Sequence, residues 1–475
     1  MTHHHLLRPL RMAATFAIAL AALGAAPTPV RDPDHLFVLS TTDVKGKTSP
    51  CGCHTPKGGL ARRAAFADSV RAEHGQVVLV DAGGFYPETE SQRETGAFLM
   101  ESMKRLGTAA ANVGDPELRY GYASLVAEAK GAGLPLVSAN LWNTRTNRPA
   151  FLPWTIVPAG RVKVGVFGLA SAQSDLGPAK DSLRVEDPES AAVRAVAELR
   201  KKGATVIVLL SQLGKVESED LVTAVEGIDV VVTGRNVPMI QRGRLIKNTV
   251  AVYGGEQGWY VGVSKLALDA GGRMVTGEND MVMLGPEVEG EPGMLGRVKA
   301  FEDALNDRLR RLEKERAAAA SVGDADADGD MVEHFVGADV CARCHRAEYE
   351  QWRTTPHGRA WQTLVDERKD ATPECVRCHV VGYGKPGGFQ TGADAPRLAN
   401  VQCENCHGMG TQHEAYAANH AVVPEATCRG CHDGTTSPVF DFAKYRPHIL
   451  HVPPAVMPEL PPNPAKALMR AKGAH

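Results

Sequence analysis

The chain has 475 residues, of which 43% are hydrophobic, so it is long enough to bury a core and to form more than one domain. Its formal net charge of -2 excludes the strongly basic character of a nucleic-acid-binding protein. Beyond the N-terminus no apolar run is long enough to cross a bilayer, so we expect no transmembrane span in the mature protein.

The first 26 residues have the pattern of a secretory signal peptide. Arg8 and Arg11 precede the apolar stretch 12–23, and Gly24 and Ala26 are small residues that suit cleavage after position 26. An uncleaved membrane anchor is the alternative, but the stretch is short for a spanning helix. We therefore predict removal of residues 1–26 and a location in the periplasm or another extracytoplasmic compartment.

Residues 35–290 alternate short apolar runs with helix-like runs, which predicts an α/β domain. The apolar runs are rich in Val, Ile and Leu, as in strands that are covered on both faces. The expected strands are Leu36–Ser40, Val77–Asp81, Leu134–Ser138, Val162–Leu169, Thr205–Ser211, Ile228–Gly234 and Thr249–Tyr253. The expected helices cover residues 60–73, 92–106, 118–131, 188–202 and 217–226.

Residues 291–333 are expected to form a helical and acidic linker. Apolar residues recur at helical spacing and predict a helix over residues 296–320 with one apolar stripe. These residues are Phe301, Leu305, Leu309 and Leu312. The acidic run 324–330 follows the helix, and we interpret it as a flexible connection to the next domain.

Cysteine and histidine are concentrated in the C-terminal domain that we expect over residues 334–475. Eight of the ten cysteines lie between positions 341 and 431, and neither residue type occurs from position 75 to 333. The segment has little periodic pattern and is rich in Gly and Pro, so its side chains alone do not predict an ordinary core. We expect a bound group around which this segment packs.

Four Cys-x-x-Cys-His motifs lie in this segment, and we number them 1 to 4 in chain order. Each is typical of c-type haem attachment, in which the two thiols form thioethers with the haem and the histidine is the proximal iron ligand. Zinc sites or disulfides would use the cysteines but would not require a histidine after each pair. The motifs therefore predict four covalently attached haem c groups. The thioether cysteines would be Cys341 and Cys344, Cys375 and Cys378, Cys403 and Cys406, and Cys428 and Cys431, and the proximal ligands His345, His379, His407 and His432.

Three of the motifs are each followed by a further set of residues that matches a known pattern. They are Tyr349, Trp352, Thr355 and His357 after motif 1, Gly408, Gly410 and His413 after motif 3, and Phe440, Phe442, Tyr445, Ile449 and His451 after motif 4. With them, residues 337–451 resemble the tetrahaem cytochrome c-554 family, which relays electrons in nitrogen metabolism. The resemblance implies a mainly helical, haem-packed domain. It also implies that His357, His413 and His451 are distal iron ligands, each serving a haem other than its nearest one in sequence.

One haem is left without an assigned distal histidine. His420, His448 and His334 are the alternatives for this ligand. Otherwise the iron is five-coordinate and open to a small molecule. Our candidate for the open site is the haem of motif 2.

The α/β segment carries a second resemblance. Its elements are residues 36–43, which end in Asp43, Gly58 to Arg62, Val78 to Gly83, Ser138 to Asn140, and Val164 to Leu169. With them, residues 35–270 resemble the calcineurin-like metallophosphoesterases of the 5′-nucleotidase type. The resemblance implies a four-layer α/β sandwich with two metal ions at its active site.

The metal ligands of that family are mostly missing, and only Asp43 stands in its expected place. The family's other ligand positions are occupied here by Lys45, Gly84, the sequence Gly114-Asp115-Pro116-Glu117, Gln212, and the sequence Gly234-Arg235-Asn236-Val237. The positive charges of Lys45 and Arg235 would repel a metal ion. We therefore expect a degenerate domain without phosphatase activity, in which these two cations could bind an anion instead.

Cys51 and Cys53 form a close dithiol in the loop after the first strand, with His54 beside them. Ligands of α/β sheets favour that edge. Three interpretations remain open. The pair is an easily reduced disulfide that exchanges electrons, or a site for a metal or a sulfur species, or an inert structural pair. The first two make Cys51, Cys53 and His54 candidate catalytic residues.

Electron transfer is the function that these patterns favour, with periplasmic redox proteins as partners. The α/β domain would then serve for docking or for binding a substrate without hydrolysing it. The alternative is a multihaem oxidoreductase that acts on a small nitrogen or sulfur species, at an open haem or at the dithiol. A phosphoesterase fused to a cytochrome is a third hypothesis, which the missing ligands oppose.

Overall fold

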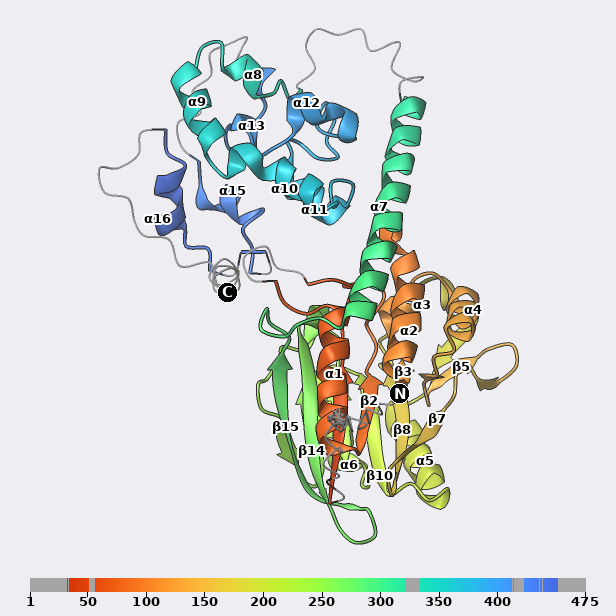
Figure 1. The fold of residues 1–475 in the computed structure, drawn as a ribbon. Helices are drawn as coiled ribbons and strands as arrows, with labels where there is room; N and C mark the ends of the chain where they lie inside the picture. The colour runs from red at the N-terminus through yellow and green to blue at the C-terminus, as the bar shows by residue number, and fades with distance from the viewer. Residues whose placement is uncertain are drawn as a thin grey trace, which may run out of the picture.

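The computed structural model describes residues 32, 34–50, 56–320, 334–411, 413, 423–434, 436–437 and 439–451. Several sequence predictions concern residues outside these ranges: the signal peptide, the acidic run 324–330, the dithiol with His54, and His420. Within them, an α/β region comes first and a region of short helices follows (Figure 1). The long helix α7 (Pro292–Ala320) connects the two.

Two six-stranded mixed sheets form the α/β region. The first has the strand order β15 (Met274–Met283), β14 (Tyr260–Leu268), β1 (His35–Thr41), β2 (Val77–Asp81), β3 (Thr108–Asn112), β4 (Leu136–Val137). The second has the order β12 (Arg244–Ile246), β13 (Thr249–Tyr253), β11 (Val230–Thr233), β10 (Val206–Gln212), β8 (Val162–Ala170), β7 (Trp154–Ala159). A small third sheet contains β6 (Arg148–Pro149), β5 (Leu141–Asn143) and β9 (Leu183–Val185).

The two large sheets pack face to face with helices outside them. Val38 of β1 and Val208 of β10 belong to one buried apolar cluster, which fills the space between the sheets. The outer face of the first sheet packs against α1 (Leu60–His74), α2 (Glu94–Leu106) and α4 (Tyr122–Ala132). The outer face of the second packs against α5 (Pro188–Lys201) and α6 (Lys215–Ala224). The predicted four-layer sandwich of the metallophosphoesterase type is therefore confirmed.

The expected elements occur, and their differences from the prediction have local causes. The helix predicted over 118–131 is divided into α3 (Asp115–Leu118) and α4, because Gly121 between them has a φ of 89°. The strand predicted over 134–138 pairs only at β4. The hairpin of β14 and β15 was missed because its residues alternate between buried and exposed, whereas the prediction relied on continuous apolar runs.

The C-terminal region consists of short helices around a small apolar cluster. Phe335, Val376 and Phe389 are among the seven buried residues of this cluster. The helices are α8 (Ala338–Cys341), α9 (Arg346–Thr354), α10 (Ala360–Asp366), α11 (Pro373–His379), α12 (Ala395–Leu398), α13 (Cys403–His407), α15 (Glu425–Arg429) and α16 (Phe442–Tyr445). Single-turn 3₁₀ helices occur in both regions. The α/β region contains η1 (Glu90–Gln92), η2 (Gly177–Ala179) and η3 (Glu256–Gly258), and the C-terminal region contains η4 (His357–Arg359), η5 (Gly392–Asp394) and η6 (Arg446–His448).

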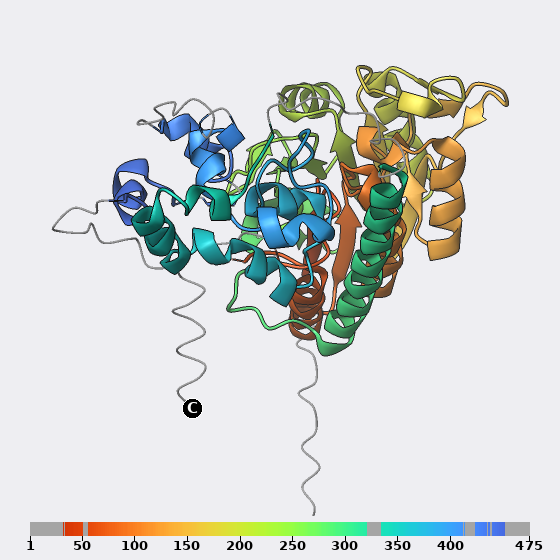
Figure 2. The ribbon, with the colours of Figure 1, turned by 90° about the horizontal axis from the view of Figure 1, so that it is seen from above.

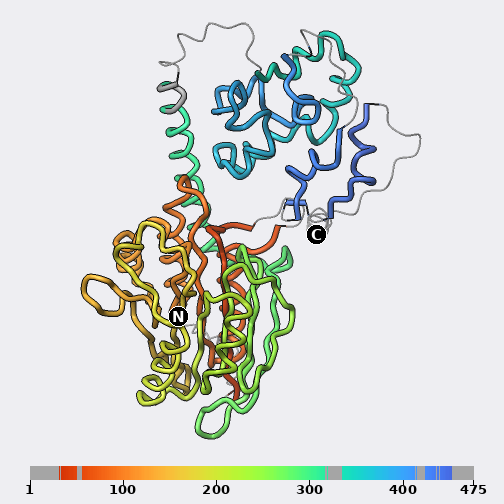
Figure 3. Tube along the Cα trace, turned by 180° about the vertical axis from the view of Figure 1, so that it is seen from behind, coloured from red at the N-terminus to blue at the C-terminus, as the bar shows by residue number. Residues whose placement is uncertain are grey.

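Helix α7 packs on the α/β region with its first half and runs beside the C-terminal region with its second half. Phe301 stacks on Phe98 of α2 with 4.1 Å between the ring centres. Seen from above, the C-terminal helices lie on one side of α7 (Figure 2). Seen from behind, they lie beyond one end of the sheets (Figure 3). Among the described residues, no helix has the length and apolar character that a membrane span requires.

Candidate functional site

Three motif histidines each face a histidine from a distant part of the chain. The distances between ring centres are 5.9 Å for His345 and His413, 6.1 Å for His432 and His357, and 6.2 Å for His407 and His451. A metal–imidazole bond is roughly 2 Å long, so two imidazoles on opposite sides of one metal ion have ring centres roughly 6 Å apart. The three pairs therefore have the spacing of two axial ligands on one iron.

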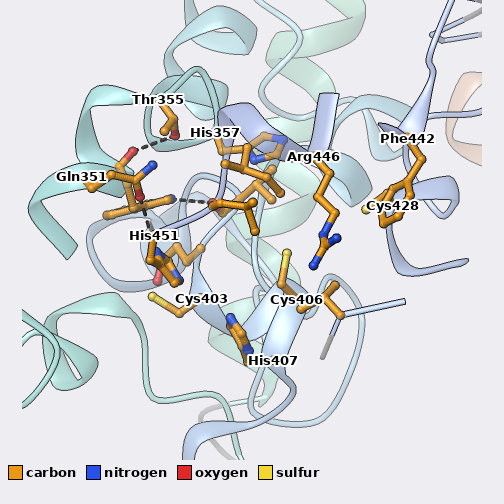
Figure 4. A pocket seen from close by; sticks show the side chains of 16 residues that line it. Gln351, Thr355, His357, Cys403, Cys406, His407, Cys428, Phe442, Arg446 and His451 are labelled. Carbon is orange, nitrogen blue, oxygen red and sulfur yellow. Dashed lines mark hydrogen bonds between the residues drawn. The ribbon is translucent and has the colours of Figure 1, made fainter. Parts of the chain in front are cut away.

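A cavity surrounds the pair of motif 3. About 160 Å³ of this cavity is open to water-sized molecules. Cys403, Cys406, His407 and His451 all line it (Figure 4). Trp352 closes another part of the wall, where its indole N–H donates to the carbonyl of Val401 at 2.7 Å. The donor set fits a covalently attached haem.

Burial favours the neutral form of three of the paired imidazoles. Burial, together with the nearby His432 and His379, lowers the pKa of His357 to about 4. Burial also lowers the pKa of His432 and of His451. Because only a neutral imidazole has a lone pair for a metal, these histidines are prepared as ligands at neutral pH.

His379 of motif 2 has a different environment. Its Nδ1 lies 2.6 Å from the carbonyl oxygen of Ala360, so Nδ1–H donates to that oxygen. This hydrogen bond fixes the tautomer and leaves Nε2 available for a metal. In the described ranges no histidine ring stacks opposite His379, unlike the other three motif histidines. Of the alternatives for its partner, His420 lies outside the described residues, the backbone N–H of His334 donates to the hydroxyl of Thr411, and His448 ends η6.

The attachment cysteines of different motifs touch each other. The thiol of Cys341 hydrogen-bonds that of Cys403, which raises the pKa of Cys341. The thiol of Cys378 hydrogen-bonds that of Cys431, which lowers the pKa of Cys378 to about 7.

Motifs 3 and 4 also meet. Cys406 of motif 3 and Cys428 of motif 4 line the same cavity. Together with the two thiol contacts, this places the motifs in the spatial order 1, 3, 4, 2, whereas the chain order is 1, 2, 3, 4.

Glu404, inside motif 3, holds three segments of this region together. Its buried carboxylate accepts hydrogen bonds from the backbone N–H groups of Val336 at 3.0 Å, Gly337 at 2.9 Å and Gly410 at 2.7 Å. These groups lie before motif 1 and in the loop that leads to His413. Sequence reasoning missed this residue, although an acid inside an attachment motif followed by two nearby glycines is a signal that could have indicated it.

The degenerate metal site of the α/β region lies where its strands end. A Cβ added to Gly84 would lie 2.3 Å from Oδ1 of Asp43, and one added to Gly234 would lie 2.5 Å from Nε2 of Gln212. The structure therefore brings these four sequence-predicted positions together at one edge of the sheets.

Neutral and cationic side chains occupy this edge. Gln212 donates to the carbonyl of Ala82 at 2.9 Å, and Lys45 pairs with Glu256 at 3.0 Å. Arg235 pairs with Asp115 at 3.5 Å. Among the described residues no group of three or more His, Cys, Asp or Glu side chains has a metal-binding arrangement. The residues present do not fit the two metal ions of the family.

Two buried acids at the same edge have raised pKa values. Burial raises the pKa of Asp43 to about 6. Burial also raises the pKa of Glu117 to about 7, although four backbone N–H groups donate to its carboxylate.

The backbone of this edge is strained. Its residues with left-handed φ values are Asp43 at 50°, Lys45 at 51°, Arg235 at 72°, Asn236 at 60° and Gln257 at 59°. Such residues cost roughly 1–3 kcal/mol each and concentrate at functional sites. The loops thus keep a strained active-site conformation although the metal ligands have changed.

Known proteins resemble the two regions separately. Residues 340–408 match the family model described as cytochrome c554 and c-prime. Cytochrome c-554 of Nitrosomonas europaea is 36% identical over 91 residues, which are 16% of this chain and 39% of that protein. A snake venom 5′-nucleotidase of Gloydius brevicauda is 30% identical over 219 residues, 44% of this chain and 36% of that protein.

A solved structure shares the α/β fold. The 5′-nucleotidase precursor of Thermus thermophilus is 27% identical, covers 57% of this chain and 59% of its own, and has a TM-score of 0.51. The chain spans less than two thirds of the length of each of these relatives. The comparisons confirm both resemblances that the sequence motifs indicate.

Proposed function

We propose that the C-terminal region binds four haem c groups and that the protein transfers electrons outside the cytoplasm, between periplasmic redox proteins. The observation that carries this proposal is the spacing of the three histidine pairs, 5.9 to 6.2 Å between ring centres. The match of residues 340–408 to the cytochrome family supports it independently. When bound, haem c supplies reversible one-electron chemistry at its iron.

The chain's own residues attach, orient and shield these groups. The eight motif cysteines provide the thioether links, and His345, His407 and His432 each form an axial pair with a partner from another segment. Each pair would hold an iron between two histidines and leave it no position for a small ligand, which would suit electron exchange without ligand exchange. The contacts between cysteines support a relay in the spatial order of motifs 1, 3, 4 and 2.

The motif 2 site supports a second candidate function. His379 is oriented by the carbonyl of Ala360 but faces no described histidine ring. An iron held there would have a free position for a small nitrogen or sulfur species, which would make the protein a multihaem oxidoreductase. The dithiol remains the alternative location for such chemistry.

The α/β region is proposed to dock or bind a small molecule without hydrolysis. The ion pairs of Lys45 with Glu256 and of Arg235 with Asp115 place positive charge where the family holds metal ions, which supports the loss of phosphatase activity. The strained loops at that edge support a retained binding role.

Mass spectrometry of the protein made in a host that matures c-type cytochromes tests the haem assignment. We expect a mass increase of four haem groups and a redox titration with several overlapping one-electron steps. A colourless protein, or one that carries its full complement at fewer than four motifs, would contradict the proposal.

A further inference from the structure

Helix α7 forms ion pairs with Arg368 and Asp370, in the segment that leads into motif 2. Arg310 donates to both carboxylate oxygens of Asp370, with distances between 2.6 and 3.1 Å. Arg368 donates to Asp303 at 2.7 Å and to Asp307 at 3.0 Å. Each side of the contact therefore supplies both charges, and the Arg310 guanidinium binds in the two-pronged geometry that makes such pairs strong.

The loop before α2 makes a second contact with the same segment. Glu374, the residue before the attachment cysteine Cys375, accepts hydrogen bonds from the hydroxyl of Thr89 and the amide of Gln92, both at 2.8 Å. The α/β region therefore contacts the residue directly before the first attachment cysteine of motif 2.

The backbone of the segment that leads into motif 2 is also conformationally constrained. Arg368 has a φ of 52°, a left-handed conformation that an arginine adopts only where its surroundings hold it. Asp370 is only 16% exposed, so its pair with Arg310 is partly shielded from solvent. Such pairs contribute more than fully exposed ones, which are worth about 1 kcal/mol or less.

The opposite end of the relay lacks this cover. Cys344, His345 and Arg346 of the motif 1 end are exposed. Motifs 1 and 2 are the two ends of the spatial order, so one end is open to solvent and the other is held against the α/β region.

We propose that α7 and residues 89–94 form a fixed intramolecular interface that limits the access of small ligands to the motif 2 site. We call this interface the junction. Through the junction, the α/β region contacts the motif 2 end of the proposed relay. The inference rests on the proposed open coordination position at motif 2 and adds the element that controls it.

The test uses the full-length, haem-loaded protein and two measurements. One is the rate at which carbon monoxide binds the reduced protein. The other is hydrogen exchange of the amides of residues 366–379, which reports opening of the junction whether or not any iron is open. Asp370→Lys places two like charges together, and Thr89→Val removes a donor to Glu374 from the α/β side alone.

Both variants are expected to speed carbon monoxide binding and hydrogen exchange, Asp370→Lys by roughly fivefold or more, the factor that about 1 kcal/mol produces. The double variant Arg310→Glu with Asp370→Lys recreates the pair with reversed charges and should return both rates toward native values. As a control, Asp280→Lys on β15, far from the junction, disrupts the ion pair of Asp280 with Arg242 and should change neither rate.

Three results would overturn the inference. Faster exchange with an unchanged binding rate would show that the junction does not control access. If carbon monoxide binding and hydrogen exchange were as fast in the double variant as in Asp370→Lys, the effect would not come from this ion pair. A native protein that binds no carbon monoxide would remove the open site and the access control with it, while the exchange data would still report whether the junction is rigid.

Discussion

The imidazole rings of His407 and His451 lie 6.2 Å apart with 22° between their planes. The first belongs to α13 and the second follows η6, so the pair brings the end of the described chain back to motif 3. The same arrangement recurs for His345 with His413 and for His432 with His357. The proposed iron ligands thus come from segments that no single helix connects, and each pair closes a loop of the chain.

Replacing His451 by alanine is expected to open the iron of motif 3, because the opposite axial position loses its imidazole. The number of carbon monoxide molecules bound per reduced chain should rise from one to two. His35→Ala, on β1 of the α/β region, is the control and should leave the number unchanged. An increase with the control, or none with His451→Ala, would refute the pairing.

Glu404→Ala is expected to destabilise the C-terminal region by about 2–4 kcal/mol, because one buried and two part-buried backbone N–H groups lose their acceptor. Denaturant unfolding followed at the haem absorbance measures this change. Glu425→Ala removes an exposed acid that pairs with Arg429 in α15, and should cost less than about 1 kcal/mol. Equal losses for the two variants would argue against the role of Glu404.

The stability of the α/β region should depend on the ionisation of Asp43. Its folded pKa of about 6 lies above the ordinary value of 3.8, so the folded state binds its proton more tightly than the unfolded state. The native protein therefore loses stability as the pH rises from about 4 to 6, by roughly 3 kcal/mol at most.

Asp43→Asn removes this ionisation. Unfolding of the α/β region at pH 4 and pH 7 should show the variant gaining stability relative to the native protein as the pH rises. Because all other carboxylates titrate in both proteins, only the difference between the two curves counts. Parallel curves would contradict the raised pKa of Asp43.

Manganese is expected neither to stabilise the α/β region nor to support phosphate ester hydrolysis. A metal ion bound to the folded state would raise its melting temperature, by an amount equivalent to about 4 kcal/mol at a thousandfold excess over Kd. Thermal unfolding with and without manganese and a nucleotide hydrolysis assay check this, with a 5′-nucleotidase as the positive control. Turnover that depends on manganese would restore the phosphoesterase hypothesis.

Restoring one ligand should not restore the metal site. Gly84→Asp would place a Cβ 2.3 Å from the Asp43 carboxylate, and the position has a φ of 75° that suits glycine. We expect this variant to be less stable than the native protein and still to bind no manganese. Manganese-dependent stabilisation of the variant would show that a single ligand is enough.

The sequence predicted local repeats and continuous apolar runs. The four motifs can be read directly, and the continuous apolar runs of β1, β2, β8 and β10 indicate buried strands. Strand β3, with the sequence Thr-Ala-Ala-Ala-Asn, has no such signal because alanine is poor at marking a strand. It belongs to the sheet because its neighbours β2 and β4 pair with it.

Contacts between distant segments could not be predicted in the same way. Resemblance named His357, His413 and His451 as distal ligands, but only the fold indicates which motif histidine each of them faces. Likewise, nothing around Asp370 in the sequence indicates Arg310 as its partner, because the contact depends on how α7 leaves the α/β region.

The difference between chain order and spatial order limits how this protein can be shortened. A chain that ended before motif 4 would keep motifs 1 and 3 in contact but would lose the neighbour through which motif 2 meets them. Such a fragment would contain one adjacent pair and one isolated site, whatever its haem content. Motif 4, the last to be synthesised, therefore connects motifs 1 and 3 to motif 2 in the proposed relay.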